Sequence, residues 1–478
     1  MAATETPPPP SPALPGTPGA AVATVAVGAD VRAERAARAR IAAAELTARD
    51  VAGVVVGWVD NAGICRVKTV PVRQLEHAAA WGVGAAPCFD VFLVDDSITD
   101  STWIGGPVGD LRLVPDLDRL VPLAAQPGWA WAPGDRITQD GHVHPGCSRQ
   151  FARRMCDAAA DRGFALRAGF EVEWIAARAG SADGAPEVPT DGPAYGMTRV
   201  VECSDYLRDI LQALDAQGLT VLQLHPEYTP GQFEVSVAAE DPVGAADSAV
   251  LVRQTVRGVS ARHGLRVSFA PVATPGTVGN GGHLHLSLWR DGVNLMHGGD
   301  GRYGLTSVGE AFLAGIVAAL PALTAVGAPS AASYLRLVPS HWAGAYRCWG
   351  LENREAAVRL ITGSTGERES GANAEVKCFD AAANPYLAMG AVIAAGLDGV
   401  ERGSVLPLET TANPAETGAE RLPASLPEAV AEFDRSAVLS AAFGPELHAA
   451  FAAVRRAEAA LFATSTPEEI VAATRWRY

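Results

Sequence analysis

Positively charged residues are scarce in this sequence. Its 478 residues include 38 Lys and Arg against 53 Asp and Glu, which gives a formal net charge of −15 at pH 7. A protein that binds nucleic acid or an anionic membrane needs a surplus of basic side chains to meet the phosphates. The composition therefore argues against nucleic acid and membrane as main partners. Small anions are not excluded as ligands, because local basic residues or a bound metal can reverse the electrostatic field within one site.

Cysteines are few, odd in number and scattered. None of the seven belongs to a Cys-x-x-Cys pair, so a disulfide framework is not indicated. Reduced thiols are typical of cytoplasmic proteins, and this is the location that we expect.

Long uncharged apolar runs are also lacking, and we expect no segment of the ~20 residues that a membrane span needs. Residues 1–25 are rich in Pro, Ala and Thr, with neither a basic start nor an apolar core. We expect a disordered tail there, not a signal peptide.

Alternating extended and helical patterns predict an α+β fold in two domains, which also suits the length of the chain. A β-branched run at Val54–Trp58, a turn at 60–63 and a second run at 65–70 predict a hairpin. Together with the Gly- and Pro-rich stretch that follows, this hairpin indicates a small β-rich domain over residues 26–142. Residues 143–478 then form a larger domain.

Helices and strands alternate in this larger domain. We expect strands at 170–176, 265–270 and 282–289, a hairpin at 221–237, and helices at 148–162, 206–217 and 308–326. Two capping boxes are expected, Ser425 with Glu428 and Ser465 with Glu468.

Four extended segments carry acidic residues or histidines on one face, because side chains two residues apart in a strand point the same way. These faces are Glu171 with Glu173; Gln232 with Glu234 and Ser236; His283 with His285 and Ser287; and Glu375 with Lys377. Any one of them is ordinarily explained as the solvated face of a half-buried sheet.

The four faces taken together are more acidic than solvated faces usually are, which indicates a bound cation. Adjacent carboxylates repel each other unless a cation joins them. Glutamates with a histidine suit Mg²⁺ or Mn²⁺ better than zinc. Two such ions neutralise phosphates in phosphoryl transfer, and Arg354 and Arg359 would add fixed positive charge.

Six ordered motifs resemble the signatures of the glutamine synthetase superfamily. They are Glu171-Val-Glu173; His225-Pro-Glu227 with Gly231-Gln-Phe-Glu234; Gly279 through Trp289; Arg336-Leu-Val-Pro339; Asn353-Arg354 through Arg359; and Glu375-Val-Lys377 through Tyr386. The resemblance implies an N-terminal β-grasp domain followed by a glutamine synthetase catalytic domain, an antiparallel sheet with flanking helices. It also implies a homo-oligomer of stacked rings, usually a dodecamer, with active sites between subunits.

The resemblance also implies roles for individual residues. One metal ion would be held by Glu173, Glu227 and Glu234, and a second by Glu171, His283 and Glu375. Glu173, Gly279, Arg336 and Lys377 match positions at the substrate glutamate, whereas His285, Ser287 and Arg359 match nucleotide-binding positions. Arg354 matches a contact to the transferred phosphoryl group. Tyr195 and Glu227 match ammonium contacts, and Asp90 matches an aspartate supplied to the neighbouring subunit's site.

Two departures from the family pattern bear on the nitrogen substrate. After Arg-Leu-Val-Pro, ammonia-using members have Gly-Tyr-Glu, whereas this chain has Ser340-His341-Trp342, and a small hydroxyl near the ammonium site becomes Leu93. A bare ammonium ion needs several acceptors around it. An amine that carries carbon gains from apolar walls and from an aromatic face such as that of Trp342. The departures therefore favour a small primary amine, with ethanolamine first.

The sequence thus predicts an ATP-dependent ligase with two or more Mg²⁺ or Mn²⁺ ions per site and with glutamate, ATP and a primary amine as substrates. The glutamate γ-carboxylate would attack the terminal phosphate, and the amine would displace phosphate from γ-glutamyl phosphate, with Asp90 or Glu227 as base. Three alternatives stay open. They are glutamine synthetase itself, a γ-glutamylpolyamine synthetase, and a non-catalytic structural relative, although all six metal-ligand positions are filled.

Overall fold

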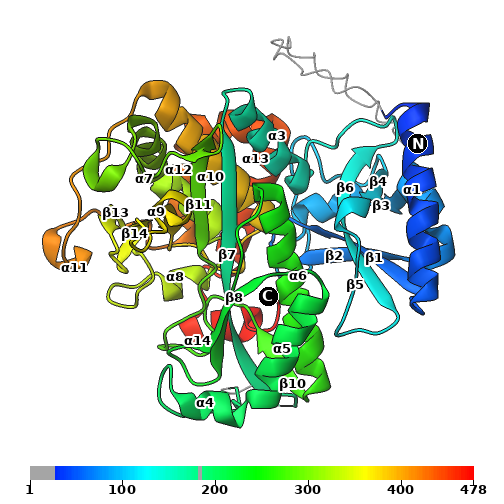
Figure 1. Cartoon of the computed structure of the whole chain (residues 1–478), viewed down its shortest axis with the longest axis horizontal. Helices are drawn as coiled ribbons and strands as arrows, with labels where there is room; N and C mark the ends of the chain where they lie inside the picture. The colour runs from blue at the N-terminus through cyan, green and yellow to red at the C-terminus, as the bar shows by residue number, and fades with distance from the viewer. Residues whose placement is uncertain (1–26, 181–185) are drawn as a thin grey trace, which may run out of the picture.

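The computed structural model describes residues 27–180 and 186–478, and these residues form the expected α+β fold (Figure 1). The expected tail at 1–25 lies outside the described residues. The described residues build two sheets. One has six strands in the order β2-β1-β6-β4-β3, with β5 beside β6. The other has nine strands in the order β13-β14-β15-β11-β7-β9-β8, with β10 beside β7 and β12 beside β11.

The six-stranded sheet belongs to the N-terminal part of the chain, on the right of Figure 1. Its strands are β1 (Gly53–Val59), β2 (Cys65–Pro71), β3 (Val83–Ala85), β4 (Leu111–Pro115), β5 (Val121–Pro122) and β6 (Trp129–Thr138). The helices beside it are α1 (Ala29–Ala48) and α2 (Leu75–Trp81), with short 3₁₀ turns η1 (Val72–Gln74), η2 (Pro87–Val91) and η3 (Leu117–Arg119). The expected hairpin is confirmed, since β1 and β2 pair antiparallel.

The nine-stranded sheet forms the centre of the larger part. Its strands are β7 (Ala165–Arg178), β8 (Val221–Pro226), β9 (Gln232–Val237), β10 (Leu265–Ser268), β11 (Leu284–Arg290), β12 (Val293–Asn294), β13 (Tyr346–Leu351), β14 (Ala356–Ile361) and β15 (Asn373–Val376). Its neighbours pair antiparallel except β13 and β14, which run parallel. The long strand β7 alternates as expected: Val172 and Trp174 join the main hydrophobic core, while Glu171 and Glu173 take the other face.

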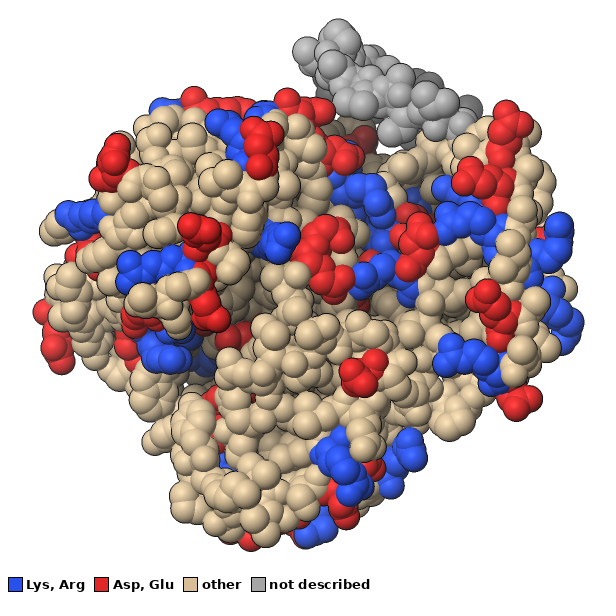
Figure 2. Space-filling view, in the orientation of Figure 1, with Lys and Arg blue, Asp and Glu red and all other residues tan. Residues whose placement is uncertain are grey.

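Helices pack against this sheet and against one another. They are α3 (Ser148–Ala160), α4 (Met197–Glu202), α5 (Ser204–Ala216), α6 (Pro242–Arg262), α7 (Ser307–Gly327), α8 (Ser333–Arg336), α9 (Arg368–Gly371), α10 (Pro385–Arg402), α11 (Pro414–Thr417), α12 (Leu426–Arg435), α13 (Ala437–Leu461) and α14 (Pro467–Thr474), with the 3₁₀ turn η4 (Arg302–Gly304). Figure 2 shows that on the viewed face basic and acidic side chains lie interspersed.

Two helices correct an expectation about apolar runs. By length and composition, α7 and α13 are each apolar enough to cross a membrane, although no such segment was expected. The helix α7 packs against α10 and α12, and 72% of its most apolar window is buried inside the protein. A buried core helix passes the same test, so the apolar length of α7 is explained by packing.

One helix start was also placed wrongly. The capping box of α14 is formed by Thr466 and Glu469, one residue after the expected pair Ser465 and Glu468. The reason is Pro467, which occupies the first helical position and makes the preceding residue the cap. At α12 the expected cap is confirmed, since Ser425 accepts a hydrogen bond from the Glu428 amide.

The two parts of the chain are joined by buried polar contacts. The Asn384 side chain donates to the carbonyls of Val59 and Asp60 at 3.0 and 3.1 Å. The Val94 amide donates to Glu458 at 2.9 Å. At Gly63 (φ +82°) a Cβ would lie 1.8 Å from the Ala382 carbonyl oxygen, so this turn needs glycine. The division proposed at residues 142 and 143 falls between β6 and α3.

Candidate active site

Strand register brings the expected metal ligands together. In the β7–β9 pair Glu173 lies opposite Glu234, and in the β11–β15 pair His285 lies opposite Glu375. Since β11 and β7 are neighbours, the acidic face of β7 meets the histidines of β11. The polar faces expected from the sequence therefore converge on one region of the sheet.

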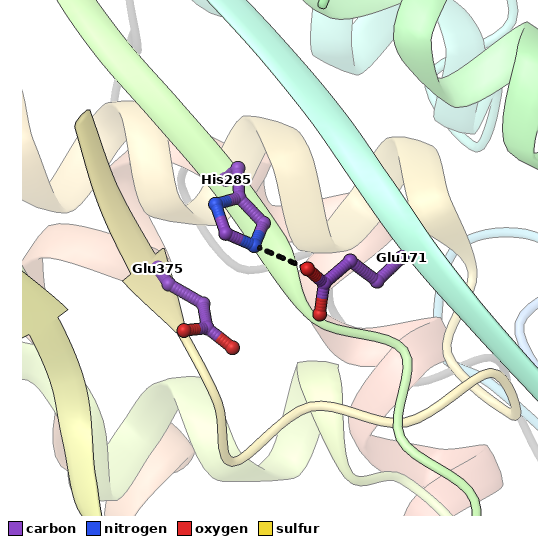
Figure 3. A group of neighbouring side chains, drawn as sticks. All are labelled: Glu171, His285 and Glu375. Carbon is purple, nitrogen blue, oxygen red and sulfur yellow. Dashed lines mark ion pairs between the residues drawn. The ribbon is translucent and has the colours of Figure 1, made fainter. Parts of the chain in front are cut away.

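A first group of candidate ligands lies where β7, β11 and β15 meet (Figure 3). One ligand atom from each of Glu171, His285 and Glu375 lies within 4.8 Å of the others. The His285 Nε2 atom is 3.1 Å from Glu171. His283 belongs to the same region, with its Nδ1 atom 2.9 Å from Glu171 and 3.3 Å from Glu375.

A second group lies beside it, where β8 and β9 pair. It consists of His225, Glu227 and Glu234, whose ligand atoms also lie within 4.8 Å of one another. His225 is 3.3 Å from Glu234 through Nε2 and 3.4 Å from Glu227 through Nδ1. Glu173 connects the two groups, since its carboxylate lies 3.8 Å from His283.

The cluster suits divalent cations. Burial, followed by the charges of Glu234 and Glu227, raises the pKa of Glu173 to about 8. Such a pKa shows how costly it is to hold several buried carboxylates together without a compensating positive charge. Carboxylate oxygens with imidazole nitrogens match the ligand preference of Mg²⁺ or Mn²⁺. The donor set therefore fits two ions, and the structure adds His225 and His285 to the candidates.

Basic side chains border the cluster. Lys377 Nζ lies 3.0 Å from Glu375, and Arg359 lies 3.2 Å from the other oxygen of the same carboxylate. Arg336 contacts His283 Nε2 at 3.2 Å. Its other terminal nitrogen is buried and has no hydrogen-bond partner among the described residues, so it remains able to bind an anion.

Gly279 is fixed by close packing. A Cβ at this position would lie 2.0 Å from the Pro271 carbonyl oxygen. The Gly279 carbonyl accepts a hydrogen bond from Gln232, which also donates to Glu173 at 2.8 Å. The backbone of this loop is therefore tied to the carboxylate cluster.

These residues face one cavity of about 770 Å³. Of the expected site residues, those lining it are Glu171, Glu173, Tyr195, Glu227, Glu234, Gly279, His283, His285, Arg336, Trp342, Arg354, Arg359, Glu375 and Lys377. Three expected residues do not line it. Ser287 is buried and accepts a hydrogen bond from the Trp289 indole at 2.8 Å, and Leu93 is a buried core residue.

Asp90 is the third expected residue outside the cavity. It is 1% exposed and its carboxylate is paired with Arg136 and His144 at 2.5 and 2.7 Å. Burial alone would raise its pKa, but these two partners outweigh burial and hold the pKa below its usual value. Within this chain Asp90 therefore acts as the buried partner of two basic groups, and its role in a neighbour's site stays a prediction.

Sequence reasoning gave no role to several lining residues. His225 precedes Glu227 by two positions, so the same alternation that found the other ligands signals it. Tyr228 also lines the cavity, and its ring packs against Trp342 with centroids 5.3 Å apart. No local pattern indicates that contact, because the two residues are far apart in sequence.

Comparison with known proteins decides the family. Residues 145–472 match the family model described as glutamine synthetase, catalytic domain. The chain belongs to the glutamine synthetase family. It is thus related to ligases that use ATP and divalent metal ions, in agreement with the carboxylate cluster.

Several glutamine synthetase family members resemble the chain over most of its length. It is 56% identical over 451 residues to gamma-glutamylpolyamine synthetase GlnA3 of Streptomyces coelicolor, covering 92% of this chain and 97% of the relative. It is 29% identical over 440 residues to glutamine synthetase of Mycobacterium tuberculosis, covering 89% and 96%.

Solved structures of the family superpose well. A novel glutamine synthase homolog matches with a TM-score of 0.81 and 35% identity, covering 90% of this chain and 99% of that one. A GmaS/ADP complex matches with a TM-score of 0.78 and 28% identity, covering 89% and 96%. These matches agree with the two-sheet architecture described above.

Proposed function

We propose that this protein ligates the γ-carboxylate of glutamate to a primary amine, with ATP converted to ADP and phosphate. The observation that carries the proposal is the cavity in which eight candidate glutamate and histidine ligands meet Arg336, Arg359 and Lys377. A ligase of this kind must neutralise phosphates and hold a carboxylate in line with the terminal phosphate. The 56% identical relative supports ligation to an amine.

Each step can then be assigned to residues of the cavity. Arg336 offers its unpartnered guanidinium nitrogen to a carboxylate of glutamate, and Lys377 lies beside the same region. Arg354 and Arg359 stabilise charge on the phosphates. Mg²⁺ or Mn²⁺ held by the two ligand groups would supply further neutralisation of phosphate charge. The γ-carboxylate oxygen bonds to the terminal phosphorus and ADP leaves.

The amine must arrive unprotonated to displace phosphate. Alkylamines titrate near ~10, like lysine, so a base has to take the proton. Glu227 is our candidate, because its carboxylate lines the cavity and accepts a hydrogen bond from the Tyr195 hydroxyl at 2.8 Å. The amine nitrogen then bonds to the acyl carbon, phosphate leaves, and a γ-glutamylamide results.

The amine that we propose first is a polyamine. The relative at 56% identity is a gamma-glutamylpolyamine synthetase. The sequence-based preference for ethanolamine depends on Trp342 and Leu93, of which only Trp342 lines the cavity in this chain.

A small monoamine such as ethanolamine is the second candidate. It is favoured by the apolar surface that Tyr228 and Trp342 present at the cavity. Ammonium, in contrast, gains nothing from aromatic area beyond a cation–π contact.

Product formation tests the proposal. Purified protein with glutamate, ATP and Mg²⁺ should release ADP only when an amine is added, and mass spectrometry should find the matching γ-glutamylamide. No amine-dependent ADP release with any amine, together with no release with ammonium, would instead support a non-catalytic role.

We further propose that the protein works as a homo-oligomer, with a dodecamer as the first expectation. Light scattering on the purified protein measures this directly. A fully active monomer would contradict the prediction that Asp90 contributes to a neighbouring subunit's site.

A further inference from the structure

The segment that carries Trp342 has an unusual backbone. Ser340, Trp342 and Gly344 all adopt left-handed conformations, with φ of +61°, +54° and +69°. A bulky non-glycine residue rarely takes this conformation, because its Cβ crowds the carbonyl oxygen. Trp342 is also 45% exposed, so burial of its ring does not account for the conformation. A side-chain hydrogen bond to the backbone is one contact that holds the segment.

That contact comes from Glu355. Its Oε1 atom accepts a hydrogen bond from the backbone N–H of Trp342 at 2.8 Å. Glu355 is itself anchored, since its amide donates to Asn353, and Asn353 donates to the carbonyls of Thr410 and Ala412. A hydrogen bond to a carboxylate is roughly twice as strong as one between neutral groups.

The position of Trp342 matters for the amine. Its ring packs against Tyr228, and the Tyr228 amide donates to Glu227 at 3.1 Å. Glu227 also accepts the hydrogen bond from Tyr195. The aromatic pair therefore adjoins the carboxylate that we propose as base, and a shift of Trp342 would change the wall next to it.

We propose that Glu355 is a specificity-determining positioning residue, which holds Trp342 against Tyr228 and so shapes the amine pocket. This inference rests on the proposed glutamate–amine ligase function. Glu355 does not line the cavity, so it acts through Trp342. Arg336 on α8 and Arg359 on β14, which we propose for glutamate and the nucleotide, contact His283 and Glu375. Arg354 precedes Glu355, but Glu355→Ala keeps the backbone hydrogen bond to Asn353 that holds this segment. Loss of the Glu355 side-chain contact should therefore affect the amine most.

Steady-state ADP release tests this with KM measured separately for amine, glutamate and ATP. We expect Glu355→Ala to raise the amine KM about tenfold, because a hydrogen bond to a charged group is lost. The KM values for glutamate and ATP should stay within about twofold, since their contacts are intact. Glu355→Gln keeps an oxygen acceptor and should restore most of the amine affinity. The exposed Glu369→Ala serves as a matched control and should change nothing.

A double-mutant cycle separates positioning from a direct effect. In a Trp342→Ala background, Glu355→Ala should add little to the amine KM, because the residue through which it acts is already gone. An equal rise in both backgrounds would overturn the inference, as would an unchanged amine KM in Glu355→Ala. A parallel rise in all three KM values would show general disruption and also overturn it. Wild-type protein without amine-dependent ADP release would refute the proposed function itself.

Discussion

Glu173→Gln should make the metal-free protein more stable at neutral pH. The pKa of Glu173 is raised to about 8 from its ordinary 4.5, first by burial and then by Glu234 and Glu227. A raised carboxyl pKa means that the charged form opposes folding, so stability is lost as pH rises from about 4.5 to about 8. At ~1.36 kcal/mol per pH unit, the loss between pH 4.5 and pH 7.5 amounts to about 4 kcal/mol, because the unfolded chain is ionised there while folded Glu173 stays mostly protonated. Glutamine avoids that cost and still accepts the hydrogen bond from Gln232.

Thermal unfolding in EDTA at pH 5 and pH 7.5 measures the effect. Wild type should lose stability between the two pH values, whereas Glu173→Gln should lose less and unfold several degrees higher at pH 7.5. Adding Mg²⁺ should reverse the order, because a ligand that binds only the folded state stabilises it, and the variant has lost a ligand. The exposed Glu45→Gln should behave as wild type. A Glu173→Gln variant less stable than wild type in EDTA would refute the reasoning.

Three further predictions address substrate, nucleotide and Asp90. Trp342→Glu should raise ammonium turnover and lower amine turnover in ADP-release assays, because it restores an acidic acceptor; unchanged preferences would contradict this. Arg359→Ala should raise the KM for ATP about tenfold or more and leave the amine KM unchanged, since it removes a charged contact to phosphate. Asp90→Asn should cost about 3 kcal/mol of stability at pH 7, because Arg136 and His144 lose a buried partner. The pKa of Asp90 is depressed, so the stabilisation from its charged form is present above its ordinary pKa of 3.8 and is lost as pH falls below that value. The difference in unfolding free energy between wild type and Asp90→Asn, measured in urea, should therefore be smaller at pH 3 than at pH 7. An Asp90→Asn variant of normal stability without amine activity would point to a role in a neighbour's site.

Strand alternation was enough to predict most of the ligand cluster. Glu171 with Glu173 and His283 with His285 each lie two residues apart, so their shared faces follow from local geometry. The sequence could not show which strands are neighbours. The pairing of Glu173 with Glu234 and of His285 with Glu375 depends on register between distant segments.

The sequence failed where the contact is long-range and irregular. Asp90 in η2 meets Arg136 on β6 and His144 after β6, and no period links these positions. Glu355 lies just before β14 and contacts Trp342 in a loop whose backbone is left-handed. Secondary-structure propensities carry no information about such a contact. At α14 the local signal is present in the sequence, because Pro467 favours the first helical position and so makes Thr466 the cap.

The relative kcat/KM for amines and ammonium tests the central claim most directly. Purified protein with saturating glutamate, ATP and Mg²⁺ is titrated in turn with spermidine, putrescine, ethanolamine and ammonium, and ADP release is followed. We predict that a polyamine gives the highest kcat/KM and exceeds ammonium by orders of magnitude. Ammonium equal to or above every amine would contradict the account and make the protein a glutamine synthetase.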